Sequence, residues 1–201
     1  MNTKRSYTMT TRARSAEETR RRILQAAFDL QSQRLSSEIG LDAVADEAGV
    51  SVQTVLRHFG NRAGLFDATV VFANELVSEE RRAPVGDVGE AVQVLVDHYE
   101  LRGDMALMIL AQESTFGHVR KISEAGKATH RAWVAEVFSP HLEGLPAPAR
   151  DEAIDLLVVA TDVYTWKLLR RDRGLSRTQT ENRIHTLVTA VLSATADRKD
   201  N

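Results

Sequence analysis

The side chains of Gln53, Thr54 and Arg57 share one face of a short stretch of helical spacing, at positions i, i+1 and i+4. The opposite face carries the apolar Val55 and Phe59. An amide, a hydroxyl and a guanidinium are groups with which proteins hydrogen-bond base edges and phosphates. The spacing therefore predicts a short helix that packs through one face and offers the other to nucleic acid.

A second predicted helix precedes this one. Its apolar residues Leu41, Val44, Ala45 and Ala48 have the spacing of a helix packed on one side. After it, the glycine at position 49 can adopt the left-handed conformation that ends a helix, and the serine at position 51 can cap the next one. Two helices joined by such a short turn are typical of a helix-turn-helix, whose second helix enters the DNA major groove. An ordinary helical hairpin with a solvated polar face is the alternative from spacing alone.

The segment AVADEAGVSVQTVLRHFGNRAGLF resembles the N-terminal DNA-binding domain of the TetR family of bacterial transcriptional regulators. Two departures stand out: Leu56 occupies the position of a phosphate-contacting Tyr, and Arg62 that of a Lys. The residues in register with the family pattern are Val44, Ala45, Ala48, Gly49, Val50, Ser51, Thr54, His58, Phe59, Leu65 and Phe66. The residues expected to contact DNA are Ser51, Val52, Gln53, Thr54, Arg57, His58, Arg62, Arg12 and Arg14.

The N-terminal end of the chain is basic. Residues 1–34 hold eight Lys or Arg against three acidic residues, a net charge of +5, whereas the whole chain carries −2. Such asymmetry favours a polyanionic partner, with a merely solvated surface as the alternative. Residues 1–14 lack apolar periodicity and are expected to form a flexible basic arm. The first helix is expected to begin at a capping box of Ser15 and Glu18.

The composition excludes several kinds of protein. The 201 residues include no cysteine, so neither a disulfide framework nor thiolate chemistry is available. The longest apolar stretch, residues 156–166, is interrupted by Asp162 and is too short to span a bilayer. We therefore expect a soluble, cytoplasmic protein that does not bind membranes.

No catalytic constellation is found in the sequence. The six histidines form no H-E-x-x-H pattern, and the chain has neither a Gly-rich phosphate loop nor a G-x-S-x-G motif. We therefore expect no enzymatic activity, no metal site and no cofactor.

The rest of the chain is expected to be helical. Helices are predicted at residues 63–82, 87–101, 104–115, from 117 to near 140, at 149–172, and from a cap formed by Ser176 and Gln179 to about 196. The total is about nine helices. The predicted divisions are an arm (1–14), a helix-turn-helix domain (15–62), a connecting helix (63–82) and a larger C-terminal domain (83–201). This is an all-α, two-domain chain, and the family resemblance implies that its C-terminal domain binds a ligand and dimerises.

The segment 154–169 is apolar on nearly all sides, and a helix of that kind needs cover that a small domain hardly provides. A partner subunit would supply this cover in an intermolecular four-helix bundle, and an intramolecular core helix is the alternative. The residues expected at the dimer interface are Leu157, Val163, Tyr164, Leu168, Leu187, Val188 and Val191.

A small-molecule pocket is predicted within the C-terminal domain, because a mostly apolar lining with a few polar groups suits such a site. A plain helical core would have the same residues. Asp162 is expected either in the pocket or at a polar contact of the dimer interface. The residues expected to line the pocket are Met105, Met108, Ile109, Gln112, Phe116, His130, Trp133, Asp162 and Trp166.

These observations predict a homodimeric transcriptional regulator, a repressor that leaves a palindromic operator on double-stranded DNA when a small-molecule effector binds. The alternatives are a helical ligand-binding or enzymatic domain with a purely structural hairpin, and a DNA-binding regulator without a small-molecule effector. The sequence identifies neither the operator nor the effector.

Overall fold

The computed structural model describes residues 3–31, 33–34 and 38–196 of the chain. These residues contain helices and turns but no strand, which confirms the predicted all-α fold class. The chain divides into two compact units, Met1–Glu75 and Leu76–Asn201. Each unit has its own hydrophobic core.

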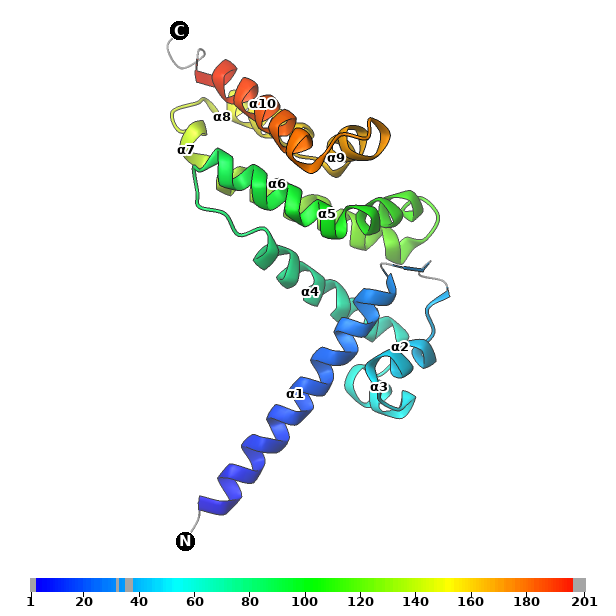
Figure 1. Cartoon of the computed structure of the whole chain (residues 1–201). Helices are drawn as coiled ribbons and strands as arrows, with labels where there is room; N and C mark the ends of the chain where they lie inside the picture. The colour runs from blue at the N-terminus through cyan, green and yellow to red at the C-terminus, as the bar shows by residue number, and fades with distance from the viewer. Residues whose placement is uncertain (1–2, 32, 35–37, 197–201) are drawn as a thin grey trace. The chain divides into compact units, whose positions relative to one another are not determined.

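The first unit is built on a long helix and a pair of short ones (Figure 1). Ile23 and Ala27 of the long helix are completely buried against Val55 and Leu65. A single packed face of the long helix therefore holds the unit together. Its helices are α1 (Thr3–Gln31), α2 (Leu41–Ala48), α3 (Val52–Phe59) and the first part of α4 (Arg62–Glu80).

Helix α1 begins earlier than the sequence predicts. We expected it to start at Ser15, but it starts at Thr3, so the backbone of the expected arm is helical from that residue. No glycine or proline lies in this stretch to end the helix. Ser15 lies inside α1, where its backbone carbonyl accepts a hydrogen bond of 2.8 Å from the Thr19 hydroxyl.

The second unit begins with the last residues of α4 and contains the remaining helices. Figure 1 shows α5 and α6 running alongside one another, with α8 and α10 on one side of them. The helices are α5 (Val88–Gln112), α6 (Gly117–Val137), α7 (Ser139–Leu142), α8 (Ala147–Ala160), α9 (Val163–Lys167), a π-helical turn η2 (Leu168–Asp172) and α10 (Arg177–Ala196).

Helix α5 is continuous, although two helices were predicted at 87–101 and 104–115. Gly103 lies within it and does not break it. A Cβ built at Gly103 would lie 2.5 Å from Cζ3 of Trp166, closer than two carbon atoms can approach. The glycine is therefore needed by tertiary packing, because the indole ring lies directly against the backbone of α5.

The predicted helix 149–172 is in fact two helices with a sharp junction. α8 ends at Ala160, and Asp162 caps α9 by accepting a hydrogen bond of 2.8 Å from the backbone N–H of Tyr164. Asp162 is thus an N-cap, a role that its place in an apolar run did not predict. The last helix follows its prediction closely, since Ser176 and Gln179 form the expected reciprocal capping box.

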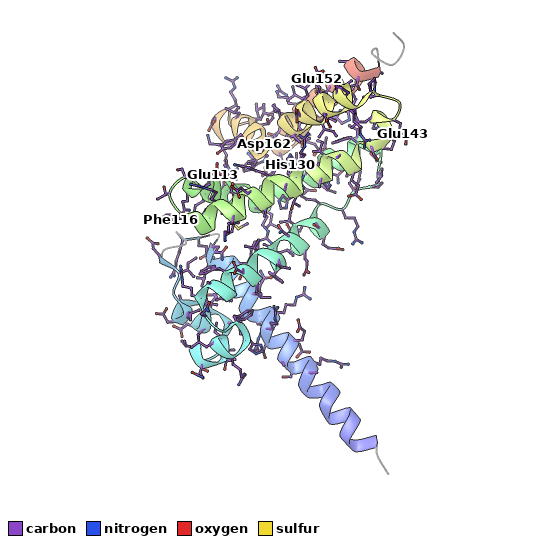
Figure 2. All side chains as sticks on the ribbon, turned by 180° about the vertical axis from the view of Figure 1, so that it is seen from behind. Glu113, Phe116, His130, Glu143, Glu152 and Asp162 are labelled. Atoms are coloured by element: carbon purple, nitrogen blue, oxygen red, sulfur yellow. The ribbon has the colours of Figure 1, made fainter. Side chains whose placement is uncertain are left out.

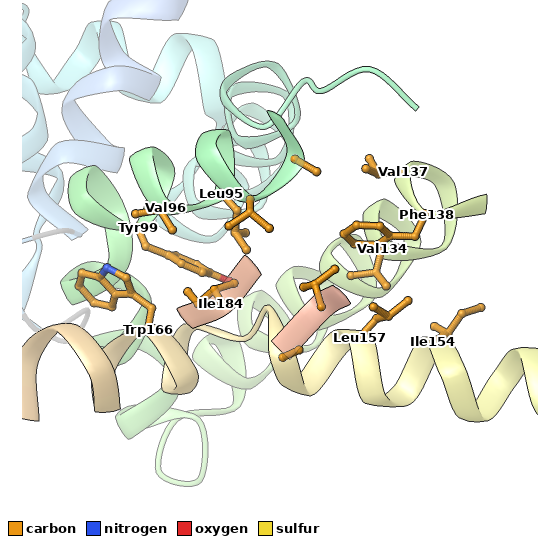
Figure 3. Close-up of a cluster of buried hydrophobic side chains, with 14 of the residues drawn as sticks. Leu95, Val96, Tyr99, Val134, Val137, Phe138, Ile154, Leu157, Trp166 and Ile184 are labelled. Carbon is orange, nitrogen blue, oxygen red and sulfur yellow. The ribbon is translucent and has the colours of Figure 1, made fainter. Parts of the chain in front are cut away.

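The core of the second unit contains residues that were predicted at the dimer interface. Figure 3 shows Leu157 and Ile154 of α8 opposite Val134 of α6 and Phe138, the residue that follows α6. Leu157, Val163 and Val188 are 0%, 6% and 0% exposed within a single chain. These three residues are therefore covered within one chain, because its own α5, α6 and α10 pack on one side of the apolar segment.

Ion pairs join α5 to the corner formed by α9, η2 and α10. Glu100 binds Arg170 and also accepts a hydrogen bond of 3.0 Å from the Trp166 indole N–H. Asp104 binds Arg171 in a bidentate pair, and Asp97 binds the arginine at position 177. The three acidic residues lie on one side of α5, so three ion pairs fix η2 and the start of α10 to this helix.

Candidate functional site

The turn between α2 and α3 has the geometry that its sequence predicts. Gly49 has φ 64° and ψ 41°, the left-handed conformation. Its N–H bonds to the Asp46 carbonyl at 3.1 Å, and the N–H of Val50 bonds to the Ala45 carbonyl at 2.9 Å. These two bonds form a Schellman motif, which satisfies carbonyls at the end of α2. Ser51 then caps α3 by accepting the N–H of Thr54 at 3.2 Å.

Helix α3 is anchored by one apolar residue and leaves its polar face open. Val55 is completely buried in the core of the first unit, whereas Gln53 and Arg57 are exposed on the opposite face of the helix. Thr54 is half-buried and its hydroxyl bonds to that of Ser51 at 3.0 Å, so this pair supports the start of α3. The exposed face therefore carries an amide and a guanidinium with rigid backbone support.

The other predicted DNA contacts of this region differ in accessibility. Ser51 and Val52 are exposed at the N-terminus of α3, and His58 is half-buried with its ring beside that of Phe59. Arg62 is held inside the unit, since its Nε donates to the Ile39 carbonyl at 3.0 Å and its guanidinium lies over the Phe66 ring. Arg62 therefore braces the start of α4, a role that its sequence position did not predict.

On α1, the backbone of the basic segment and part of its side chains are described. Arg14 is exposed, whereas the side chain of Arg12 lies outside the described residues. Arg20 was not predicted, but its guanidinium lies 5.2 Å from the centre of the Phe59 ring on α3. The helical spacing gave no signal for this contact, because it joins two separate helices.

The predicted pocket residues do not form one site. Met105, Met108 and Ile109 are half-buried along the second half of α5, where Gln112 donates to the Met108 carbonyl at 2.9 Å. Figure 2 shows Phe116 at one end of α6 and His130 midway along it. Elsewhere, Trp166 is completely buried in the core and Asp162 caps α9.

His130 instead belongs to a buried polar cluster with Arg81. The Arg81 Nη2 donates to His130 Nδ1 at 2.8 Å, so the histidine is neutral and carries its proton on Nε2. Burial, together with the positive charge of Arg81, lowers the pKa of His130 to about 3. Arg81 also stacks on the Trp133 ring at 4.2 Å, and the Trp133 indole N–H donates to the Arg81 carbonyl at 2.8 Å.

A second charged residue, Glu80, directly precedes Arg81 in the chain. Glu80 binds Arg102 in a bidentate pair and accepts a hydrogen bond of 2.9 Å from His98. Burial by itself would raise the pKa of Glu80, but the hydrogen bonds from His98 and Arg102 lower it to about 2. Glu80 therefore stays ionised and is fully engaged by α5.

A groove of about 280 Å³ opens between the end of α4 and α6 within the second unit. Arg81 and Trp133 line it together with Ser78 and Thr129. Trp133 belongs both to this groove and to the predicted pocket. Arg81 was missed by sequence reasoning, because it follows α4 outside the apolar stripe of that helix and nothing local marks it.

The exposed apolar residues of the second unit lie mainly on its last helices. Of the predicted interface residues, Tyr164, Leu168 and Leu187 are 50%, 58% and 44% exposed. Val191 is half-buried. Leu156 and Val159 of α8, which were not predicted, are 47% and 64% exposed.

Over the described ranges, no three His, Asp or Glu side chains are gathered in a way that would hold a metal ion. Nor is any helix in that part of the chain both long enough and apolar enough to cross a bilayer.

Comparisons with known proteins identify the first unit. Residues 23–69 match the family described as "Bacterial regulatory proteins, tetR family". The chain is also 29% identical over 111 residues to an uncharacterized HTH-type transcriptional regulator, YdeS, from Bacillus subtilis (strain 168). That match covers 55% of this chain and 51% of YdeS, so the chain aligns with about half of that relative.

Solved structures resemble the whole fold. A tetR-family transcriptional regulator from Streptomyces coelicolor superposes with a TM-score of 0.67 at 17% identity, over 92% of this chain and 84% of the other. A transcriptional regulator from Rhodococcus sp. Rha1 gives 0.65 at 18% identity, over 87% and 96%. At these identities, the likeness establishes the fold.

Proposed function

We propose that this chain, whose residues 23–69 match the tetR family of bacterial regulatory proteins, is a homodimeric transcriptional repressor that leaves a palindromic operator when a small-molecule effector binds. The observation that carries the proposal is the exposed face of α3. Gln53 and Arg57 lie on this face, and Val55 anchors the opposite face in the core. The proposal places the protein in the cytoplasm, in contact with the chromosome. Enzymatic activity forms no part of it.

The geometry of α3 supports direct reading of base edges. The capped N-terminus of α3 leaves Gln53 and Arg57 exposed on one side, and their side chains suit adenine and guanine respectively. Basic residues of α1 add sequence-independent attraction to phosphates. Specificity would therefore come from α3 and much of the affinity from charge.

The test is binding of the purified protein to genomic fragments, followed by footprinting of the bound site. Arg57→Ala and Gln53→Ala are each expected to weaken specific binding, since a good bidentate base contact is worth about 1–3 kcal/mol. Arg150→Ala serves as the matched control, because it removes an exposed arginine from the second unit. Equal loss on operator and random DNA would show that these side chains do not read bases, and failure to protect any genomic site would contradict the proposed function.

The proposed dimer interface uses exposed surfaces of α8 and α10. Leu156 and Val159 on α8 and Leu187 on α10 remain exposed in the single chain, although all three are large and apolar. Grouped apolar side chains of this kind mark an interaction surface. A second copy packing its own α8 and α10 there would form a four-helix bundle, and a two-fold symmetric protein suits a palindromic operator.

Effector release is tested by linkage. A ligand that lowers operator affinity must itself bind more weakly, by the same factor, when operator is present. Its binding can be followed by intrinsic fluorescence, since both tryptophans of the chain, Trp133 and Trp166, lie in the second unit. A ligand that binds without the reciprocal effect would not be the effector.

A further inference from the structure

The most unusual charge in the second unit is that of Arg81. Its side chain is 4% exposed, and its Nε has no hydrogen-bond partner. Burial lowers the pKa of Arg81, but an arginine in a protein remains protonated. A buried cation with an unused donor is costly unless something else occupies the site.

The residues around Arg81 do not neutralise it. His130 accepts one of its hydrogen bonds but is uncharged. The neighbouring carboxylate of Glu80 is held by Arg102 and His98, and Tyr99 donates its hydroxyl to the Thr161 carbonyl at 2.9 Å. Across the described residues, no ion pair to Arg81 is found.

The groove beside Arg81 suits an amphipathic molecule. Its lining includes the apolar Val77, Trp133 and Val137 and the hydroxyl groups of Ser78 and Thr129. Two further charges line it, Arg82 and Glu136, which are opposite in sign. Arg81 differs from both because it is buried and has no ion pair among the described residues, and it is held in place by its stacking on the indole and its bond to the imidazole.

We propose that this groove binds a small monocarboxylate with an apolar body, whose carboxylate accepts hydrogen bonds from the guanidinium of Arg81. The free Nε–H supplies one donor, and the apolar part of the ligand packs along Trp133 and Val137. One cation in an apolar groove fits a monocarboxylate better than a phosphate, which carries more charge and needs more donors. Naming this ligand as the effector rests on the function proposed above.

The position of Arg81 at the end of α4 links ligand binding to the helix that begins in the first unit. Arg81 directly follows Glu80, the last residue of α4, and its N–H bonds to the Val77 carbonyl at 3.0 Å. α4 begins at Arg62 within the first unit. A ligand that binds Arg81 therefore contacts the residue that directly follows α4, a helix whose first residues belong to the DNA-binding unit.

The experiment measures binding of hexanoate, octanoate and benzoate to the full-length, DNA-free protein by calorimetry and tryptophan fluorescence. Each acid is compared with its own alcohol, which has the same apolar body and no charge. At least one acid is expected to bind about tenfold or more tightly than its alcohol, because a charge-assisted hydrogen bond distinguishes them. Equal affinity for acid and alcohol, or no binding of any acid up to millimolar concentrations, would overturn the proposal.

Variants identify the site. Arg81→Gln is expected to remove the preference for the acid over its alcohol, and Arg81→Lys to retain part of it. Arg82→Gln is the matched control, since its exposed side chain at the same groove bonds to Glu79. An unchanged preference in Arg81→Gln, or an equal loss in Arg82→Gln, would contradict the assignment to Arg81.

The two proposals can fail separately. Acid binding that is lost in Arg81→Gln, but leaves operator binding unchanged, would support the site and reject its role as the effector site. If the protein binds operator but no carboxylate binds the protein or changes its operator affinity, the proposed repressor function stands and a carboxylate is not its effector. Circular dichroism of each variant confirms that a lost response is not lost folding.

Discussion

At the scale of single residues, Gly103 and Gly126 form a natural contrast. Both lie inside helices, where glycine is about 1 kcal/mol less favourable than alanine. A methyl group at Gly126 would meet nothing within 4 Å, whereas at Gly103 it would lie 2.5 Å from the Trp166 ring. The same substitution should therefore have opposite effects at the two sites.

Gly126→Ala is expected to raise the free energy of unfolding by up to about 1 kcal/mol. Gly103→Ala is expected to lower it by about 1–3 kcal/mol, because the core must shift to admit the methyl group. Thermal unfolding followed by tryptophan fluorescence measures both. A Gly103→Ala protein as stable as the wild type would show that Trp166 can move away without cost.

Protonation of His130 makes stability depend on pH. Its pKa is about 3 in the folded chain, against an ordinary value of 6.5. Between these values the unfolded state binds more protons, so stability falls as pH decreases from about 6.5. Glu80, with its pKa lowered to about 2, adds a further loss below about 4.5.

His130→Gln is expected to flatten the fall in melting temperature between pH 6.5 and 5, although the buried His98, whose pKa is also lowered, keeps part of it. His130 Nε2 lies 3.2 Å from the Thr161 hydroxyl oxygen, and an amide can accept from Arg81 and donate to Thr161 as the imidazole does. The exposed His185→Gln is the control. An unchanged slope in His130→Gln would mean that this histidine becomes charged without disturbing the fold.

At the scale of elements, local signals predicted the turn between α2 and α3 and the start of α10. The glycine and serine of the α2–α3 turn, and the capping box before α10, act through backbone bonds to residues within five positions, which a sequence displays directly. The packing role of Gly103 and the capping role of Asp162 were missed for the opposite reason. The packing of Trp166 on α5 and the junction between α8 and α9 depend on contacts between distant segments.

The same limit applies to the candidate sites. The exposed face of α3 follows from helical spacing, whereas Arg81 meets His130 and Trp133 across about fifty positions of sequence. The burial of Leu157 and Val188 likewise depends on which helices pack around them. Periodicity identifies an apolar face, but it does not say whether the chain or a partner covers it.

Helix α1 provides a test of the basic segment. Deleting residues 2–14 is expected to make the slope of log affinity against log salt shallower, by about 0.9 for each phosphate that the protein no longer neutralises. Replacing Lys4, Arg5, Arg12 and Arg14 with Gln keeps the length of the segment and should give the same change. If the deletion alone changes the slope, the segment acts through its length and not through its charge.

At the scale of the whole molecule, the structure separates core positions from interface positions on the last helices. Val159→Asp is expected to give a folded monomer that binds operator poorly, because Val159 is 64% exposed on α8. Val163→Asp should instead unfold the second unit, since Val163 is 6% exposed and a lone carboxylate would be buried there.

Sedimentation and circular dichroism distinguish these outcomes. Val85→Asp is the matched control, because Val85 is 52% exposed but lies in the loop before α5. A Val159→Asp protein that stays dimeric would move the interface away from α8. Dissociation of Val85→Asp would place the interface near that loop instead.

The packing of Trp166 on Gly103 also restricts how this sequence can evolve. A larger residue at position 103 is harmful while the indole is present, but it becomes acceptable once position 166 holds a smaller side chain. Substitutions at the two positions are therefore expected to occur in a fixed order, with position 166 changing first. Among relatives with this fold, a bulky residue aligned with Gly103 should then be accompanied by the loss of the tryptophan.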